Sequence, residues 1–268
     1  MTSEPMDPNA PIGFFDSGLG GLTVWRETVE LLPVEDTIYL ADSANAPYGE
    51  KDPAHILELA RSNTRWLLGE GCKLIVVACN TATTNAIAQL RAEFPIPFIG
   101  IEPAIKPAAL RSGTGKIGVL ATRGTLASAL FATTTRNHAA DTQILEQEGE
   151  GLVAMIEAGH ADSPQMRRQL KRLLDPLIRS GIDHLVLGCT HYPLLRPLLA
   201  ELLPPGIEVV DCGAPVARQA RAVLQQHDGL REAGREGSHR LYTNGDPEIM
   251  QRVVRTLGRE VPVLRLPV

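Results

Sequence analysis

Two of the four cysteines in this chain stand at the ends of closely similar segments. Cys79 ends the segment GCKLIVVAC and Cys189 ends the segment GIDHLVLGC, and the two align without a gap. In both, an apolar run typical of a buried strand precedes the cysteine, and polar residues able to open a helix follow it. Unpaired N–H groups at a helix N-terminus lower the pKa of a nearby thiol. We therefore expect both thiols to have a pKa lowered toward neutrality.

A matched pair of thiols suits one kind of reaction in particular. Racemisation requires one group that removes the α-proton and a second group, on the opposite face of the same carbon, that supplies a new one. A hydrolase would instead need one nucleophile and an oxyanion hole. A single free cysteine is commonly a small buried hydrophobe, but two at equivalent positions favour chemistry. The sequence thus predicts racemisation, with Cys79 and Cys189 as an acid/base pair.

Polar residues near the same strand ends are candidate partners of the thiols. Asp16 ends the first apolar run and His191 follows Cys189 by two residues, so each can set the protonation state of a thiol or stabilise charge on a substrate. Hydroxyl and amide groups, together with helix N-termini, can bind a carboxylate without an arginine. Each such residue could also be only a helix cap. The residues of this kind are Ser17, Asn80, Thr81, Thr122 and Thr190.

The loop NAPYGE adds Tyr48 and Gly49, which can bring a further backbone donor to the site, although an ordinary Pro/Gly turn explains them equally well. A dinucleotide site is a second interpretation of this region, because Gly18, Gly20 and Gly21 follow a strand and Asp42 lies at a distance typical of a ribose contact. Thr23 stands where that pattern needs its third glycine. We therefore expect no dinucleotide cofactor.

A zinc site is a third interpretation, because the residue types that bind zinc recur near the thiols. No CxxC or HxxxH spacing accompanies them, so we expect no metal. The residues concerned are Cys79, Cys189, His191 and Cys212.

The elements that must position these residues alternate as in a wound α/β fold. Apolar runs at 11–15, 37–41 and 74–78 alternate with segments whose apolar residues recur at helical spacing. Continuous apolar runs indicate strands buried on both faces, as in a parallel sheet covered by helices. Ligands bind beyond the carboxyl ends of such strands, which is where both cysteines stand.

The second half of the chain repeats the first. IGFFDSG at 12–18 matches IGVLATR at 117–123 in form, as the two cysteine segments match each other. The stretch FPIPF followed by Glu102 and Pro103 is typical of a crossing between halves, and we expect the return near 209–213. The prediction is two related α/β domains with parallel-sheet cores and the active site in the cleft between them. The first comprises 1–100 plus 210–268, with 1–10 as a disordered tail, and the second comprises 101–209.

Bulk composition excludes several classes of protein. A net charge of −5 and a pI near 5.8 argue against nucleic acid as a partner, because phosphate-backbone binding needs a basic face. The first ten residues lack a basic start and an apolar core, so no signal peptide is expected, and no tract is long enough to cross a membrane. Four scattered cysteines do not make a disulfide framework. We expect a cytoplasmic protein with free thiols and no membrane partner.

Six segments together resemble those of the glutamate racemases, in the same order along the chain. They are GFFDSGLGGLTV, ADSANAPYGEK, VVACNTATT, GIEPAIKPA, LVLGCTHYPLL and YTNGD. The resemblance spans the chain from about residue 11 onward, and ACNTAT with GCTHYP is its most specific part. It implies two α/β domains around a glutamate site, catalysis without pyridoxal phosphate or metal, supply of D-glutamate for peptidoglycan and the cell wall, and a homodimer.

The resemblance also assigns roles to residues. It implies that Cys79 acts on D-glutamate and Cys189 on L-glutamate, and that Glu157, in MIEAG, assists catalysis. Relatives often carry Cys-Pro where this chain has Gly149-Glu150, and often Ser where it has Cys212. The residues that match substrate-binding or assisting positions are Asp16, Ser17, Tyr48, Gly49, Asn80, Thr81, Thr190 and His191.

Three other functions are compatible with the same fold. An aspartate racemase would keep both thiols and change the substrate, whereas a decarboxylase of the same superfamily uses a single cysteine. A non-enzymatic amino-acid-binding protein would retain the cleft without needing either thiol. The pair of thiols disfavours the decarboxylase, and the choice of glutamate over aspartate depends on the resemblance.

Overall fold

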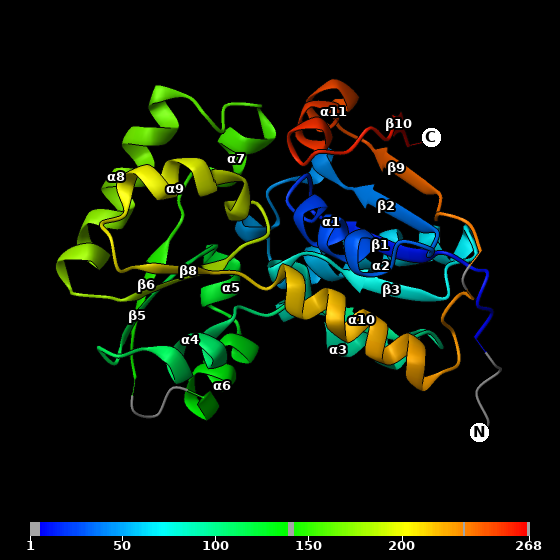
Figure 1. Ribbon diagram of the computed structural model, residues 1–268, viewed down its shortest axis with the longest axis horizontal. Helices are drawn as coiled ribbons and strands as arrows, with labels where there is room; N and C mark the ends of the chain where they lie inside the picture. Colours follow the sequence, from blue (N-terminus) through cyan, green and yellow to red (C-terminus); the bar gives the residue numbers. More distant parts are fainter. Residues whose placement is uncertain (1–5, 139–141, 233, 267–268) are drawn as a thin grey trace.

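The computed structural model describes residues 6–138, 142–232 and 234–266, and it confirms an α/β fold with two parallel sheets. Figure 1 shows the sheets in two lobes, the four-stranded sheet on the left and the six-stranded sheet on the right. None of the described helices is long and apolar enough to span a membrane.

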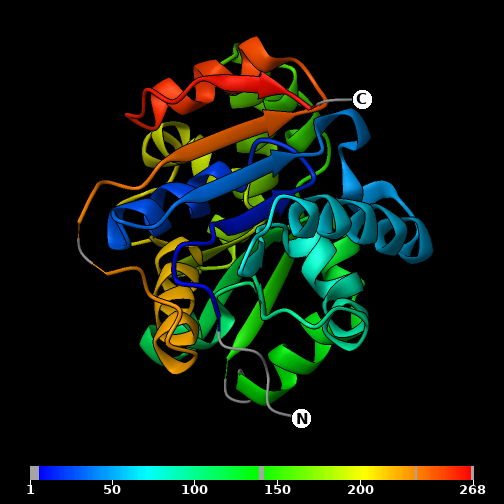
Figure 2. The ribbon, with the colours of Figure 1, turned by 90° about the vertical axis from the view of Figure 1, so that its right-hand side faces the viewer.

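The six-stranded sheet has the strand order β10-β9-β2-β1-β3-β4, and all neighbouring strands are parallel. Figure 2 shows β9 beside β2 and β10 beyond β9, so the end of the chain extends the sheet that its beginning starts. The strands are β1 (Ile12–Asp16), β2 (Thr37–Ala41), β3 (Leu74–Val77), β4 (Phe98–Gly100), β9 (His239–Thr243) and β10 (Val263–Arg265).

The four-stranded sheet repeats the centre of the larger one. Its order β6-β5-β7-β8 has the same chain sequence of strands as β2-β1-β3-β4, and it too is parallel throughout. The strand before Cys79 and the strand before Cys189 therefore hold equivalent places in the two sheets. The strands are β5 (Lys116–Ala121), β6 (Gln143–Glu148), β7 (His184–Gly188) and β8 (Glu208–Val210).

The repeat extends to backbone conformation. Gly71 and Gly181, aligned in the two cysteine segments, both have φ of +78° in the turn that leads from a helix into a strand. This left-handed conformation is one that glycine adopts without steric cost. The same glycine therefore turns the chain into β3 and into β7.

Strands of the large sheet are buried on both faces, as their continuous apolar runs predict. Phe14, Tyr39 and Val76 belong to one hydrophobic cluster, whereas Phe15 and Ile75 belong to another on the opposite face. The first cluster also includes residues of α10 and α11, which follow the second lobe in the chain. The C-terminal segment thus completes the core that the N-terminal segment begins.

Helices cover both sheets, and in the described part of the chain three short 3₁₀ helices lie in the connecting loops. The helices of the first lobe are α1 (Leu22–Leu31), α2 (Pro53–Gly69), α3 (Asn80–Glu93), α10 (Gly213–Gln226) and α11 (Pro247–Thr256). The others are α4 (Ile105–Arg111), α5 (Arg123–Leu126), α6 (Ala129–His138), α7 (Leu152–Glu157), α8 (Pro164–Arg179) and α9 (Arg196–Leu202). The 3₁₀ helices are η1 (Ser43–Asn45), η2 (Tyr48–Glu50) and η3 (Tyr192–Leu195).

The expected disordered tail is wrong for residues 6–10, while residues 1–5 lie outside the described residues. Ala10 donates to the carbonyl of Asp7 in a turn, and the buried amine of Lys73 donates to the carbonyl of Pro8 over 2.7 Å. The same amine pairs with Glu35 at 2.6 Å. A buried ammonium must be matched by acceptors, and this requirement fixes the segment before β1 in place.

Candidate active site

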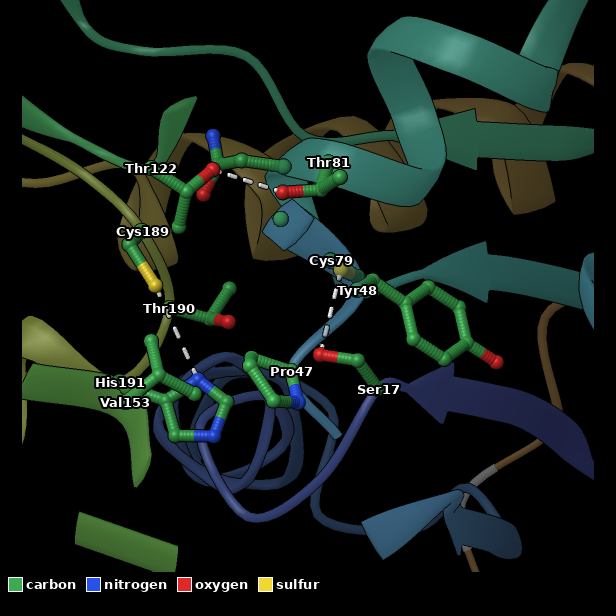
Figure 3. A pocket seen from close by; sticks show the side chains of 12 residues that line it. Ser17, Pro47, Tyr48, Cys79, Thr81, Thr122, Val153, Cys189, Thr190 and His191 are labelled. Carbon is green, nitrogen blue, oxygen red and sulfur yellow. Dashed lines mark hydrogen bonds between the residues drawn. The ribbon is translucent and has the colours of Figure 1, made fainter. Parts of the chain in front are cut away.

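One pocket between the two lobes brings together most of the residues that the sequence singles out. Figure 3 shows Cys79 and Cys189 on two sides of it. The space is about 250 Å³, counting the part open to solvent. Its lining residues are Ser17, Pro47, Tyr48, Gly49, Cys79, Asn80, Thr81, Thr122, Val153, Cys189, Thr190 and His191.

Cys79 lies at the N-terminus of α3, as predicted. Its sulfur accepts a hydrogen bond from the backbone N–H of Ala82 at 3.4 Å and lies 3.6 Å from the hydroxyl of Ser17. The backbone N–H of Thr83 closes the first helical turn on the carbonyl of Cys79 at 2.8 Å. The side chain is nearly fully buried, with 4% of its surface exposed.

The expected lowering of the Cys79 pKa is wrong. Burial raises the pKa of this thiol well above its usual value, and the charge of the neighbouring Asp16 raises it further. Hydrogen bonds from Ala82 and Ser17 lower it, but by less. Burial destabilises the thiolate more than the hydrogen bond at the helix N-terminus stabilises it. Cys79 is therefore a neutral thiol.

Cys189 has a different local backbone from the one the sequence suggests. After β7 the chain makes a turn and the 3₁₀ helix η3, and no α-helix begins at Thr190. Pro193 explains the difference, because it stands where Thr83 stands in the first half and has no N–H for the carbonyl of Cys189. The thiol of Cys189 therefore does not face the N-terminus of a long helix.

A histidine and a carboxylate take the place of that helix. His191 Nδ1 lies 3.7 Å from the sulfur of Cys189, and His191 Nε2 lies 2.5 Å from an oxygen of Glu157. Burial by itself lowers the pKa of His191, but its hydrogen bonds with Cys189 and Glu157 outweigh burial and raise the pKa well above the usual value. The ring is therefore held as an imidazolium, which stabilises negative charge on the adjacent sulfur.

Glu157 also joins the two lobes. The oxygen that pairs with His191 accepts the backbone N–H of Leu19 at 2.6 Å, and Leu19 follows β1 in the other lobe. A Cβ on Gly18 would lie 2.0 Å from this carboxylate, and one on Gly20 would lie 2.4 Å from the ring of His191. The turn after β1 therefore needs glycine to let these side chains approach.

Asp16 is fully buried at the end of β1 and organises the turn that follows. Its carboxylate accepts the backbone N–H groups of Ser17 and Gly21, each at 2.7 Å, and lies 3.4 Å from the hydroxyl of Thr190. Burial raises the pKa of Asp16, while the charge of His191 and the Gly21 N–H lower it. Asp16 does not line the pocket, so it influences the thiols through charge and through Ser17.

The remaining polar residues divide between the lobes and meet across the pocket. Thr81, on α3, lies 2.8 Å from the hydroxyl of Thr122, which caps α5 in the second lobe. Asn80 is buried, and neither polar atom of its side chain has a hydrogen-bond partner within the described structure. An unpaired buried amide is costly, so this group is available to a ligand.

Tyr48 and Gly49 line the pocket, but the Tyr48 hydroxyl does not point into it. Figure 3 shows its ring directed away from both cysteines, and the hydroxyl donates to Asp42. Sequence reasoning did not identify Pro47 or Val153, which also line the pocket. Neither side chain has a polar or reactive group that would identify it as a site residue in the sequence. Both line the pocket because η2 and α7 face the same space in the folded chain.

The zinc and dinucleotide interpretations gain no support from the geometry. In the described part of the chain, no group of three or more His, Cys, Asp and Glu side chains is arranged to hold a metal ion. The carboxylate of Asp42, the candidate ribose contact, already accepts hydrogen bonds from Asn45, Tyr48 and Asn244. The protein's own donors thus account for the contacts of Asp42 without a ribose hydroxyl.

Comparison with known proteins gives consistent similarities along the chain. The model of the Asp/Glu/Hydantoin racemase family matches residues 21–220. The chain is 47% identical over 259 residues to the glutamate racemase of Stutzerimonas stutzeri, a match that covers 96% of this chain and 97% of that protein.

Two solved structures have the same architecture. Glutamate racemase isoform RacE1 from Bacillus anthracis superposes with a TM-score of 0.87 at 30% identity, covering 97% of this chain and 98% of that chain. Escherichia coli glutamate racemase, in complex with L-glutamate and the activator UDP-MurNAc-ala, gives a TM-score of 0.84 at 34% identity, with 96% and 97% covered.

Proposed function

The chain belongs to the Asp/Glu/hydantoin racemase family, and from this membership we propose that it interconverts L- and D-glutamate through a two-thiol acid/base mechanism. The observation that carries the proposal is the pair Cys79 and Cys189, which line one pocket from two different lobes. Two groups that approach one carbon from opposite sides are what stereochemical inversion without a cofactor requires.

In each turnover one proton leaves the α-carbon and another is delivered to its opposite face. With L-glutamate, the thiolate of Cys189 takes the α-proton, and the thiol of Cys79 delivers its proton to the opposite face, which leaves D-glutamate and a thiolate at Cys79. With D-glutamate the two sulfurs exchange roles. The arrangement suits the first direction, since burial keeps Cys79 a neutral thiol that can deliver a proton, and the imidazolium of His191 lies beside the sulfur of Cys189.

The assisting residues follow from their contacts. His191 and Glu157 stabilise charge at Cys189, whereas Asp16 and Ser17 act on the side of Cys79. The carboxylates of glutamate are bound by neutral donors, because none of the described residues that line the pocket is a lysine or an arginine. These donors are Ser17, Asn80, Thr81, Thr122, Thr190 and the backbone of Tyr48 and Gly49.

Further parts of the proposal concern organisation and setting. Residues 1–100 with 210–268 form the first domain and residues 101–209 the second, each built around one of the two sheets. The protein works in the cytoplasm as a homodimer and supplies D-glutamate to peptidoglycan synthesis, as the full-length likeness to glutamate racemases suggests.

A substrate panel followed by circular dichroism tests the proposal. Both enantiomers of glutamate should lose optical activity and converge on the same racemic mixture, with aspartate turned over far more slowly. The proposal is wrong if neither enantiomer of glutamate changes. Faster turnover of aspartate would identify an aspartate racemase, and binding of glutamate without turnover would favour a non-enzymatic amino-acid-binding protein.

A further inference from the structure

Asp42 is a buried carboxylate that, among the described residues, accepts hydrogen bonds from three side chains and has no ion-pair partner. It follows β2 directly, is 3% exposed, and its backbone N–H donates to the carbonyl of Asp16 at 3.0 Å. One oxygen accepts the amides of Asn45 at 2.8 Å and Asn244 at 2.5 Å, and the other accepts the hydroxyl of Tyr48. A charge buried without a counter-ion is stabilised only by such hydrogen bonds, so the four groups form one cooperative cluster.

The three donors come from separate segments that the cluster ties together. Asn45 belongs to η1, Tyr48 to η2, and Asn244 to the loop after β9. The side-chain oxygen of Asn244 also accepts a hydrogen bond from the backbone N–H of Ala44 at 2.9 Å. Asn63, on α2, donates to the Tyr48 hydroxyl at 3.2 Å. Burial and then the charge of Asp42 raise the pKa of Tyr48, so its hydroxyl stays protonated and donates.

The loop that this cluster holds is one wall of the pocket. Pro47, Tyr48 and Gly49 line the pocket, and Gly49 approaches the second lobe so closely that a Cβ there would lie 2.8 Å from the side chain of Thr122. The position of this wall thus depends on the carboxylate of Asp42, which does not itself line the pocket.

We propose that Asp42, with Asn45 and Asn244, is a positioning cluster that holds residues 47–49 against the pocket and thereby sets the affinity for the amino-acid substrate. The proposal rests on the racemase activity proposed above. Among the described hydrogen bonds, none joins Asp42, Asn45 or Asn244 to either thiol, so loss of this cluster should weaken binding and leave proton transfer largely intact.

The chain contains a matched control at the other end of the same strand. Asp36 precedes β2 as Asp42 follows it, and its carboxylate also accepts several donors, from Arg235 and Ser238 among others. Asp36 lies at the edge of the sheet away from the pocket. Replacement of either aspartate by asparagine breaks a comparable network, but only one of the networks supports the pocket wall.

The experiment compares Asp42→Asn and Asp36→Asn with the wild type in glutamate racemisation. Asparagine turns one acceptor into a donor that faces other donors, so we expect Asp42→Asn to raise KM for both enantiomers about tenfold, as loss of a charged hydrogen bond does, with kcat within about twofold. Asp36→Asn should lower the midpoint of thermal unfolding and leave KM unchanged. An unchanged KM in Asp42→Asn, or a fall confined to kcat, overturns the proposal.

A second variant covers the case in which Asp42→Asn does not fold. Tyr48→Phe removes only the hydroxyl that donates to Asp42, and it should raise KM about threefold in the same way. A KM equal to that of the wild type in this folded variant also overturns the proposal. If the wild type itself does not racemise glutamate, the proposed function fails; an active wild type whose variants keep the wild-type KM rejects only the positioning role.

Discussion

Cys79 and Cys189 end equivalent strands of two similar sheets, yet their sulfurs have different neighbours. Cys79 caps a 14-residue helix and contacts two neutral groups, the backbone N–H of Ala82 and the hydroxyl of Ser17. Cys189 precedes a short 3₁₀ helix and contacts His191, which is paired with Glu157. Equivalent strand ends can therefore hold two thiols in matching places while one sulfur contacts neutral groups and the other contacts a charged histidine.

The thiols themselves carry the largest expected effect. Cys79→Ser and Cys189→Ser should each lower kcat/KM by about 10³-fold, because a serine hydroxyl is a far weaker acid and base at neutral pH. Polarimetry with both enantiomers measures the loss. Cys72→Ser is the control, since Cys72 is equally buried but does not line the pocket. Normal racemisation by either catalytic variant would contradict the two-thiol mechanism.

Glu157→Gln tests the half of the site around Cys189. Without the carboxylate, His191 loses the partner that favours its charged form, and kcat/KM should fall about 10²-fold. The fall must be equal in both directions, because the equilibrium constant between enantiomers is one. The asymmetry appears instead in the α-deuterium isotope effect, which should increase more for L-glutamate than for D-glutamate.

The control for this prediction is the same substitution at an exposed ion pair. Glu148→Gln removes the partner of Arg123 at the protein surface and should leave both the rate and the isotope effects unchanged. Equal increases of the isotope effect for the two enantiomers of glutamate would show that Glu157 does not act through Cys189 alone.

The raised pKa of His191 makes a prediction about stability and pH. A group whose pKa rises on folding stabilises the folded state. This contribution is complete when the pH is below the pKa of the unfolded state, near 6.5, and it is lost as the pH rises through the pKa of the folded state. The stability advantage of the wild type over His191→Asn should therefore shrink as the pH rises above about 6.5. Urea unfolding of both proteins measures it, and an advantage independent of pH would exclude a charged His191.

The smallest effect is expected at Ser17, on the side of Cys79. Ser17→Ala removes one neutral hydroxyl 3.6 Å from the sulfur, so kcat should fall only about threefold, the worth of a weak neutral hydrogen bond. A loss as large as that of Glu157→Gln would mean that the two halves of the site are more alike than their contacts indicate.

The fold and the place of the site followed from the sequence because they depend on strong local patterns. Apolar runs and two aligned glycine turns specify matching strands, and in parallel sheets the residues after such strands share one edge. The thiol at each strand end was therefore predictable from spacing alone.

The electrostatics of the site were not predictable in the same way. The pKa of Cys79 depends on complete burial beside Asp16, which is a property of three-dimensional packing. The contact between Glu157 and Leu19 joins residues far apart in the chain, and no local pattern specifies it. Pro193, by contrast, was a visible signal: a proline four residues after Cys189 rules out the helix that Thr83 closes after Cys79.

The most direct test of the two-thiol account is the fate of the α-proton in deuterium oxide. The enzyme is given L-glutamate or D-glutamate, and both substrate and product are analysed by mass spectrometry during the first turnovers. The account predicts that the product enantiomer carries deuterium from the start while the remaining substrate keeps its proton, for both directions. Transfer of the substrate's own proton to the product, or deuterium entering both enantiomers at equal rates, would contradict it.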